Sequence, residues 1–155
     1  MGFAVGNEIL IGALEKIKSY LDYGAFTPIQ VAAASALSSD PSTIAKVREV
    51  YKKRRNVLVD AMSKAGWEIP SPDATMFAWA PIPEKFRSLG SLEFSKVLLK
   101  EADISVAPGI GFGEYGENFV RIGLVENEHR IRQAARNIKA VFTKADKILS
   151  DHSPN

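Results

Sequence analysis

Residues 29–37 read IQVAAASAL, and a helix with this sequence is apolar on nearly every side. Its start is well marked, because Thr27 suits the N-cap position, Pro28 position N1 and Gln30 position N3. A helix that is apolar all round must be covered on every side in the folded protein. A chain of 155 residues offers little material for that cover. We therefore expect this segment to need more partners than its own neighbours supply.

The residues before this helix are expected to lack a sheet of their own. Residues 2–6 (GFAVG) are predicted to form a short buried strand that begins without a turn or cap. Asn7 is a good N-cap for a helix that runs to about Leu21. The apolar face of that helix consists of Leu10, Ala13, Leu14, Ile17 and Leu21. Residues 1–38 are thus interpreted as one strand and two helices, separate from the rest.

From residue 40 onward, the pattern predicts a compact α+β domain with helices on one face of a small mixed or antiparallel sheet. Helices are expected from Asp40 to Ala65 with Gly66 at C′, over residues 91–102, and from Asn127 to about residue 149. Strands are expected over residues 67–69, 76–80, 104–107 and 119–124. The predicted domains are therefore residues 1–38, residues 39–150 and a frayed tail, residues 151–155.

Composition argues against several classes of protein. The formal net charge of +2 is too small for a nucleic-acid-binding surface, and the basic run KVREVYKKRRNVL is interpreted as a solvated helix face. No apolar run approaches the roughly 18 residues of a membrane span. The chain has no cysteine, and neither His129 nor His152 has a partner at metal-ligand spacing, so we expect no metal site. The absence of cysteine fits a cytoplasmic protein.

The stretch from Gly111 to Gly116 spells G-x-G-x-x-G, the pattern of dinucleotide-binding turns. In such turns the glycines open a helix, whose N-terminus holds the pyrophosphate. Here the glycines lead into the apolar run 119–124, which is predicted to be a strand, and position 131 is isoleucine rather than the ribose-binding acid. We therefore reject a dinucleotide site.

Arg121 lies inside the same apolar run, where a charge is costly unless an anion meets it. One explanation is a position on an edge strand, with an ion pair to Glu114, Glu117 or Glu126. The other is a binding site, in which the glycine loop lets a ligand approach and the planar guanidinium grips a carboxylate or phosphate. The residues alone leave both explanations open.

These residues resemble the class I and II aminotransferases of fold type I, which depend on pyridoxal 5′-phosphate (PLP). The stretch APGIGFGEYGENFVRIGL is similar to the family's C-terminal signature, a P-G-x-x-F-G loop followed by a strand with R-[IL]-[GS]. SPDATMFAWAPIP resembles the family's strand entry, with Ala74 in place of the usual glycine. GFAVGN and FTPIQVAAASAL match the segments that follow the family's lysine loop, and DYGAFTPIQ resembles the bacterial alanine aminotransferase-like subgroup.

The resemblance implies that the full enzyme transfers an amino group between an α-amino acid and a 2-oxo acid, and that it is a homodimer. It implies that Arg121 binds the substrate α-carboxylate, with Gly109 and Phe112 beside it in the loop 108–113. Tyr23 and Thr27 are implied to lie near the dimer interface and the partner's cofactor phosphate.

The family's Schiff-base lysine and phosphate-binding arginine are expected upstream of residue 1. The resemblance implies that residues 1–38 are a remnant of the large PLP-binding domain and that residues 39–150 are the small C-terminal domain. Lys16 and Lys18 follow the GFAVGN motif and are on the wrong side of it to replace that lysine. We therefore expect this chain by itself to contain no catalytic residue, to bind no PLP and to be inactive. The alternative is a stand-alone α+β binding or regulatory module, in which Arg121 holds an anionic small ligand without catalysis.

Overall fold

The structure is a computed structural model that describes residues 1–151. It divides into two compact units, Met1–Ala45 and a second unit that begins at Lys46. The division falls inside helix α3 (Ser42–Lys64), whereas the sequence analysis places a boundary after residue 38. The interpretation of residues 1–38 as a remnant of a larger domain stays a prediction. Of the predicted frayed tail, Asp151 ends a helix, and residues 152–155, with His152, lie outside the described range.

The first unit contains helices α1 (Glu8–Leu21) and α2 (Thr27–Leu37). Asn7 caps α1 as predicted, because its Oδ1 accepts hydrogen bonds from the amides of Ile9 and Leu10. The predicted cap of α2 is wrong by one position. Phe26 occupies the N-cap position, and Thr27 is the first helical residue. No side chain caps the helix, and Pro28 in its first turn favours the helical backbone there.

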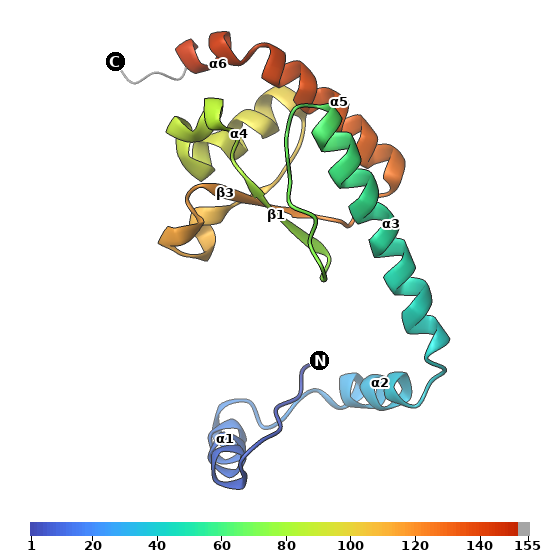
Figure 1. Ribbon diagram of the computed structural model, residues 1–155. Helices are drawn as coiled ribbons and strands as arrows, with labels where there is room; N and C mark the ends of the chain where they lie inside the picture. The colour runs from blue at the N-terminus through green and yellow to red at the C-terminus, as the bar shows by residue number, and fades with distance from the viewer. Residues whose placement is uncertain (152–155) are drawn as a thin grey trace. The chain divides into compact units, whose positions relative to one another are not determined.

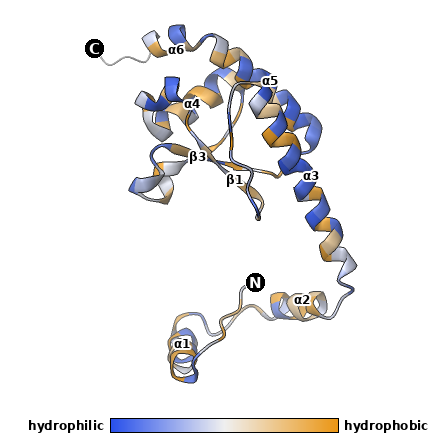
Figure 2. Ribbon diagram, in the orientation of Figure 1, coloured by the Kyte–Doolittle hydropathy of each residue, from blue (hydrophilic) through white to orange (hydrophobic). Residues whose placement is uncertain are grey.

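The predicted strand over residues 2–6 is wrong, because these residues are exposed and form no regular structure. A strand satisfies its backbone N–H and C=O groups by pairing with another strand, and no described segment pairs with this one. Both helices also leave apolar side chains in solvent. Figure 2 colours the ribbon of α2 largely on the hydrophobic side of the hydropathy scale. No residue of α1 or α2 is buried, and Leu37 is 74% exposed. Within this unit, the apolar helix lacks the cover that its sequence requires.

In the described residues, the second unit is a three-stranded antiparallel sheet with helices packed on it (Figure 1). Its strands are β1 (Phe77–Pro81), β2 (Ala107–Pro108) and β3 (Phe119–Gly123), in the order β1-β3-β2. Its helices are the rest of α3, α4 (Gly90–Ala102), α5 (Glu128–Thr143) and α6 (Ala145–Asp151). Short 3-10 helices form the connections: η1 (Glu84–Leu89), η2 (Gly109–Phe112) and η3 (Glu114–Gly116). The predicted α+β class is confirmed.

Two predicted strands differ in the structure, because their backbone groups bond elsewhere. Residues 67–69 form a loop that buries Trp67 and Ile69. The Trp67 amide donates to the carbonyl of Met62 at 2.9 Å, and the indole Nε1 donates to the carbonyl of Pro81 at 2.7 Å. The strand predicted over residues 104–107 shrinks to β2, because the amide of Ile104 donates to the carbonyl of Leu98 in α4.

The predicted C-terminal helix is two helices. Asn127 caps α5 as expected, since its Oδ1 accepts from the amide of Arg130 at 3.0 Å. At Lys144 the amide donates to the carbonyl of Val141 at 3.0 Å, a tighter turn that ends α5 before α6 begins. Gly66 follows α3 with φ 89°, the left-handed conformation predicted for its C′ position.

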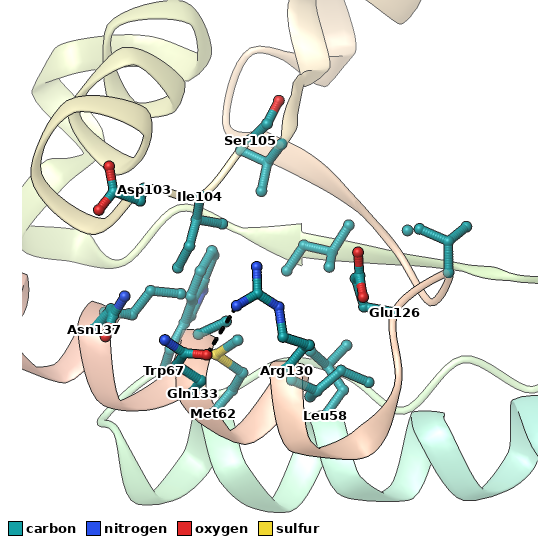
Figure 3. Close-up of a pocket in the computed structure, with 17 residues that line it drawn as sticks. Leu58, Met62, Trp67, Asp103, Ile104, Ser105, Glu126, Arg130, Gln133 and Asn137 are labelled. Carbon is teal, nitrogen blue, oxygen red and sulfur yellow. Dashed lines mark hydrogen bonds between the residues drawn. The ribbon is translucent and has the colours of Figure 1, made fainter.

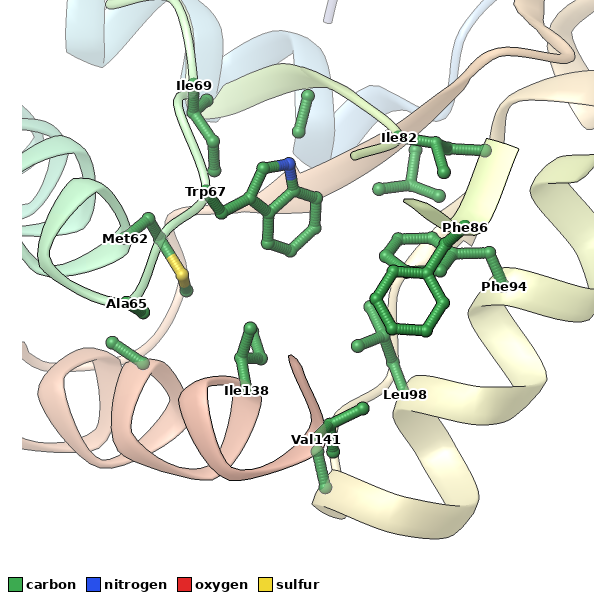
Figure 4. Packing of buried hydrophobic residues seen from close by; sticks show 14 of the residues in the cluster. Met62, Ala65, Trp67, Ile69, Ile82, Phe86, Phe94, Leu98, Ile138 and Val141 are labelled. Carbon is green, nitrogen blue, oxygen red and sulfur yellow. The ribbon is translucent and has the colours of Figure 1, made fainter. Parts of the chain in front are cut away.

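The core of the second unit lies between one face of the sheet and the helices (Figure 4). The sheet contributes Ala78, Ala80 and Val120, which have no exposed surface. Trp67 packs edge-on against Phe94, with ring centroids 5.7 Å apart. The helices add Leu58, Met62, Phe86, Leu98, Ile138 and Val141. The helices cover this face of the sheet. The candidate functional side chains of the strands are therefore sought on the opposite face.

Candidate functional site

Arg121 of β3 lies opposite Trp79 of β1 in the antiparallel register. Side chains alternate between the two faces of a strand, so the buried neighbours Ala78, Ala80 and Val120 place Trp79 and Arg121 on the face away from the core. Since β3 lies between β1 and β2, Arg121 is on the central strand. The predicted functional arginine is therefore held by the most firmly paired strand of the sheet.

The neighbours of Arg121 are aromatic rather than acidic. Its Cζ lies 4.2 Å from the ring centroid of Phe77 and 4.4 Å from that of Phe112. Within residues 1–151, no ion pair to Arg121 is formed. The explanation by an edge strand and an ion pair is therefore wrong for all three candidates, Glu114, Glu117 and Glu126.

Glu117 is instead held at the start of α4. Its Oε1 accepts a hydrogen bond from the Ser91 amide at 3.1 Å, and its Oε2 accepts from the Ser91 hydroxyl at 2.9 Å. The same hydroxyl accepts from the amide of Ile110 at 3.1 Å. Gly90, with φ 70°, leaves the space that the carboxylate fills, because a Cβ there would overlap it. The sequence does not predict the hydrogen bonds between Ser91 and Glu117, because no local pattern relates two residues so far apart in the chain.

The loop between β2 and β3 folds back on itself at Gly109 and Gly116. A Cβ on either residue would overlap the carbonyl oxygen of the other, so both positions require glycine. Gly109 is buried and thus has a role inside the loop. Its expected place beside the substrate stays a prediction.

Phe112 belongs to an aromatic cluster on the same face as Arg121. The Trp79 ring meets Phe112 edge-on, with centroids 5.7 Å apart, and stacks on Phe119 at 5.5 Å with an interplanar angle of 19°. Phe112 is 52% exposed and Trp79 is 38% exposed, so the cluster borders solvent. One guanidinium beside an aromatic surface suits a small acid with an apolar part, such as an amino acid.

A cavity of about 590 Å³ lies behind the sheet, lined by residues of α3, α5 and the segment before β2 (Figure 3). Met62, Trp67 and Ile104 form an apolar wall, and Arg130 donates a hydrogen bond to Gln133 at 3.1 Å. Arg121 does not line this cavity, which agrees with its place on the other face. No pattern in the sequence predicts this cavity.

Three carboxyl groups near helix ends have lowered pKa values. Hydrogen bonds from Lys18 lower the pKa of Asp22, those from Ser42 lower that of Asp40, and a bond from its own amide lowers that of Glu128. The described part of the chain holds no cluster of three or more possible metal ligands. None of the helices in residues 1–151 has the length and hydropathy of a membrane span.

Tyr23 and Thr27 belong to the first unit, where Tyr23 is 92% exposed and Thr27 begins α2. Tyr23 and Lys18 border a hollow of about 480 Å³. Lys18 forms an ion pair with Asp22, and the lining contains Glu15 but no arginine that could meet a phosphate. The residues present therefore do not form a PLP site by themselves, and the roles expected for Tyr23 and Thr27 stay predictions.

The chain resembles known proteins over most of its length. It is 68% identical over 149 residues to a putative aminotransferase, AatC, of Rhizobium meliloti, covering 96% of this chain and 37% of that protein. It is 54% identical over 149 residues to the glutamate-pyruvate aminotransferase AlaC of Escherichia coli, covering 96% of this chain and 36% of that protein. The chain thus spans about a third of the length of these relatives.

Solved structures give the same result. The apo structure of BacF from Bacillus subtilis matches with a TM-score of 0.80 and 34% identity, over 88% of this chain and 35% of that one. The aromatic aminotransferase of Pyrococcus horikoshii matches with a TM-score of 0.81 and 28% identity, over 92% of this chain and 38% of that one. The family model for aminotransferase class I and II matches residues 1–138. The chain belongs to the class I and II aminotransferase family.

Proposed function

We propose that this chain forms the C-terminal part of an aminotransferase that moves an amino group between an α-amino acid and a 2-oxo acid. We further propose that Arg121 binds the α-carboxylate that both substrates share. The observation that supports this proposal most directly is that the guanidinium of Arg121 has no hydrogen-bonding partner among the described residues. It lies on the face of the sheet away from the core, and no hydrogen bond or ion pair within the described residues uses its donors.

The geometry of a guanidinium suits this role. Its planar fork donates two parallel hydrogen bonds to a carboxylate, which fixes both the position and the orientation of the acid. An α-carboxylate held in this way brings the α-carbon to one defined place, so that the reacting bonds can be aligned. Phe112 contacts the guanidinium and, with Trp79, forms an aromatic surface beside it.

PLP is the cofactor of this family and supplies the electron sink for the substrate carbanion. We assign no step in that chemistry to this chain, because Tyr23, Thr27 and their neighbours do not form a PLP site by themselves. The part of this chain is to bind and orient the substrate. The complete enzyme is proposed to be a homodimer, with Tyr23 and Thr27 near the interface and the partner's cofactor phosphate.

A chimera with the E. coli relative tests the role of Arg121. In it, this chain replaces the matching 149 residues of AlaC, and transfer between glutamate and pyruvate is measured. Arg121→Ala removes a charge-assisted pair of hydrogen bonds, so kcat/KM is expected to fall about 100-fold or more for glutamate and for pyruvate. Arg121→Lys keeps the charge but not the fork, and is expected to recover only part of the loss.

The matched control is Arg87→Ala. Arg87 is exposed and pairs with Glu84 at 2.7 Å within η1, so its loss is expected to leave the kinetics within about twofold of the unchanged chimera. Unchanged KM and kcat in the Arg121→Ala chimera would contradict the proposed carboxylate role.

A further inference from the structure

Phe77 approaches Arg121 from the neighbouring strand β1, and Phe112 approaches it from η2, the short helix after β2. In the register of β1 and β3, Phe77 pairs with Gly123 and Trp79 pairs with Arg121, so Phe77 is the diagonal neighbour of Arg121 on the same face. Phe112 comes from the loop that follows β2, on the other side of β3. The distances from the guanidinium carbon to the ring centroids, 4.2 Å and 4.4 Å, both lie within the range of a cation–π interaction.

These contacts leave the hydrogen-bond donors of Arg121 unused. A phenyl ring attracts the cation through its face but offers no oxygen to accept the N–H groups. Within residues 1–151, no carboxylate pairs with Arg121, and Glu117 is occupied by Ser91. The two rings therefore restrain the guanidinium without competing with a ligand for it.

The backbone that carries each ring is held by its neighbours. Thr75 has φ 73°, a conformation that costs free energy for a β-branched residue, and its hydroxyl both accepts from the Phe77 amide at 3.0 Å and donates to the Phe77 carbonyl at 3.3 Å. The loop of Phe112 is held by the contact between Gly109 and Gly116. Trp79 meets the Phe112 ring edge-on.

From this arrangement we propose that Phe77 and Phe112 are positioning residues, which hold the guanidinium of Arg121 ready for a carboxylate. The inference rests on the proposed function, because it gives Arg121 a carboxylate to receive. An arginine that is already restrained loses less side-chain freedom when the ligand binds, so the rings raise affinity without touching the ligand. They also shield the cation from water and strengthen its bond to an anion.

Nuclear magnetic resonance of the whole 155-residue chain tests the restraint directly. Ring currents are expected to move the Arg121 Nε–H signal upfield, and rotation of the guanidinium is expected to be slow. Phe77→Leu and Phe112→Leu keep apolar volume without a ring, and each is expected to remove part of the shift. Phe119→Leu is the matched control, because Phe119 stacks on Trp79 and makes no ring contact with Arg121, so the shift is expected to remain.

Kinetics of the AlaC chimera test the consequence for binding. Each leucine variant is expected to raise KM for glutamate about 2- to 5-fold with a smaller change in kcat, the range of one exposed cation–π contact. Phe77→Tyr keeps the ring and is expected to restore both KM and the Nε–H shift, whereas a merely misfolded variant is recognised by its circular dichroism spectrum.

The outcomes separate the two proposals. If Arg121→Ala abolishes activity while Phe77→Leu and Phe112→Leu change neither KM nor the Nε–H signal, the positioning role is refuted and the carboxylate role stands. If the leucine variants remove the shift but Arg121→Ala leaves KM unchanged, the rings restrain an arginine that binds no substrate, and both proposals fail.

Discussion

At the scale of single residues, Ser91 joins two parts of the second unit. It is fully buried, and its hydroxyl donates to Glu117 while accepting from the amide of Ile110. Ser91→Ala removes both of these hydrogen bonds, which are partly buried. We expect the free energy of unfolding to fall by about 1–3 kcal/mol, the usual cost of stranding such groups. Urea unfolding followed by the fluorescence of buried Trp67 measures it.

Ser105→Ala is the control for this change. Ser105 is exposed, and within the described residues its side chain makes no hydrogen bond, so its loss is expected to alter stability by less than about 0.5 kcal/mol. If both variants were equally stable, Ser91 would not anchor the loop that carries Phe112.

The sequence indicated Arg121 because one charge stands in an apolar run after a glycine loop. It could not indicate Phe77, since that contact depends on which residues of β1 and β3 lie opposite each other. The anchor between Ser91 and Glu117 was equally invisible, because it joins a helix start to a loop 26 residues away. Local sequence patterns indicate whether a residue is unusual for its segment. The residues that it contacts depend on the strand register and on how the loops fold back.

At the scale of the elements, an ion pair links α3 and α5. Lys53 Nζ lies 3.7 Å from Oε1 of Glu128. The pKa of Glu128 is held below its ordinary 4.5, first by a hydrogen bond from its own backbone amide and then by the nearby charges of Lys53 and Arg54. Since the folded state favours the charged form, this carboxylate stabilises the fold above its unfolded pKa, and the contribution is lost as pH falls through the folded pKa.

Glu128→Gln is therefore expected to destabilise the chain at about pH 6, and this effect is expected to shrink as pH falls through the lowered pKa of the native Glu128 carboxyl. Urea unfolding at a series of pH values measures the difference between the two proteins. Glu101→Gln is the control, because Glu101 is exposed and forms no ion pair within the described residues. A difference for Glu128→Gln that does not change with pH would count against this linkage.

Helices were easier to predict than strands for a physical reason. The caps at Asn7 and Asn127 and the glycine at position 66 act locally, and the structure confirms all three. Strands need partners, and residues 2–6 have none among the described segments. The strand predicted over residues 67–69 was wrong, because Trp67 forms its hydrogen bonds within a loop.

At the scale of the whole molecule, the two units differ in how much of their surface is buried. No residue of α1 or α2 is buried, whereas α5 buries Ile131, Ala135, Ile138 and Val141. Amides of a helix without tertiary cover exchange through local opening. Hydrogen–deuterium exchange is expected to be fast throughout α1 and α2 and slow in α5. Equal protection of α2 and α5 in the isolated chain would show that the first unit is covered in solution.

The fold class followed from the sequence because the second unit buries its own core. The first unit shows the opposite case. Its apolar helix was predicted to need cover, and the structure leaves Val31 63% and Leu37 74% exposed. Capping residues and helix propensity determine where these helices form. They do not determine which surface covers the apolar side chains, because that depends on tertiary packing.

The most direct measurement of the carboxylate role compares two amino donors in the AlaC chimera. Glutamate and 4-aminobutyrate share the distal carboxylate, and only glutamate has an α-carboxylate. If Arg121 binds that group, Arg121→Ala lowers kcat/KM for glutamate about 100-fold or more and leaves the value for 4-aminobutyrate nearly unchanged, so that the preference for glutamate collapses. A preference that survives the substitution would show that Arg121 does not bind the substrate carboxylate.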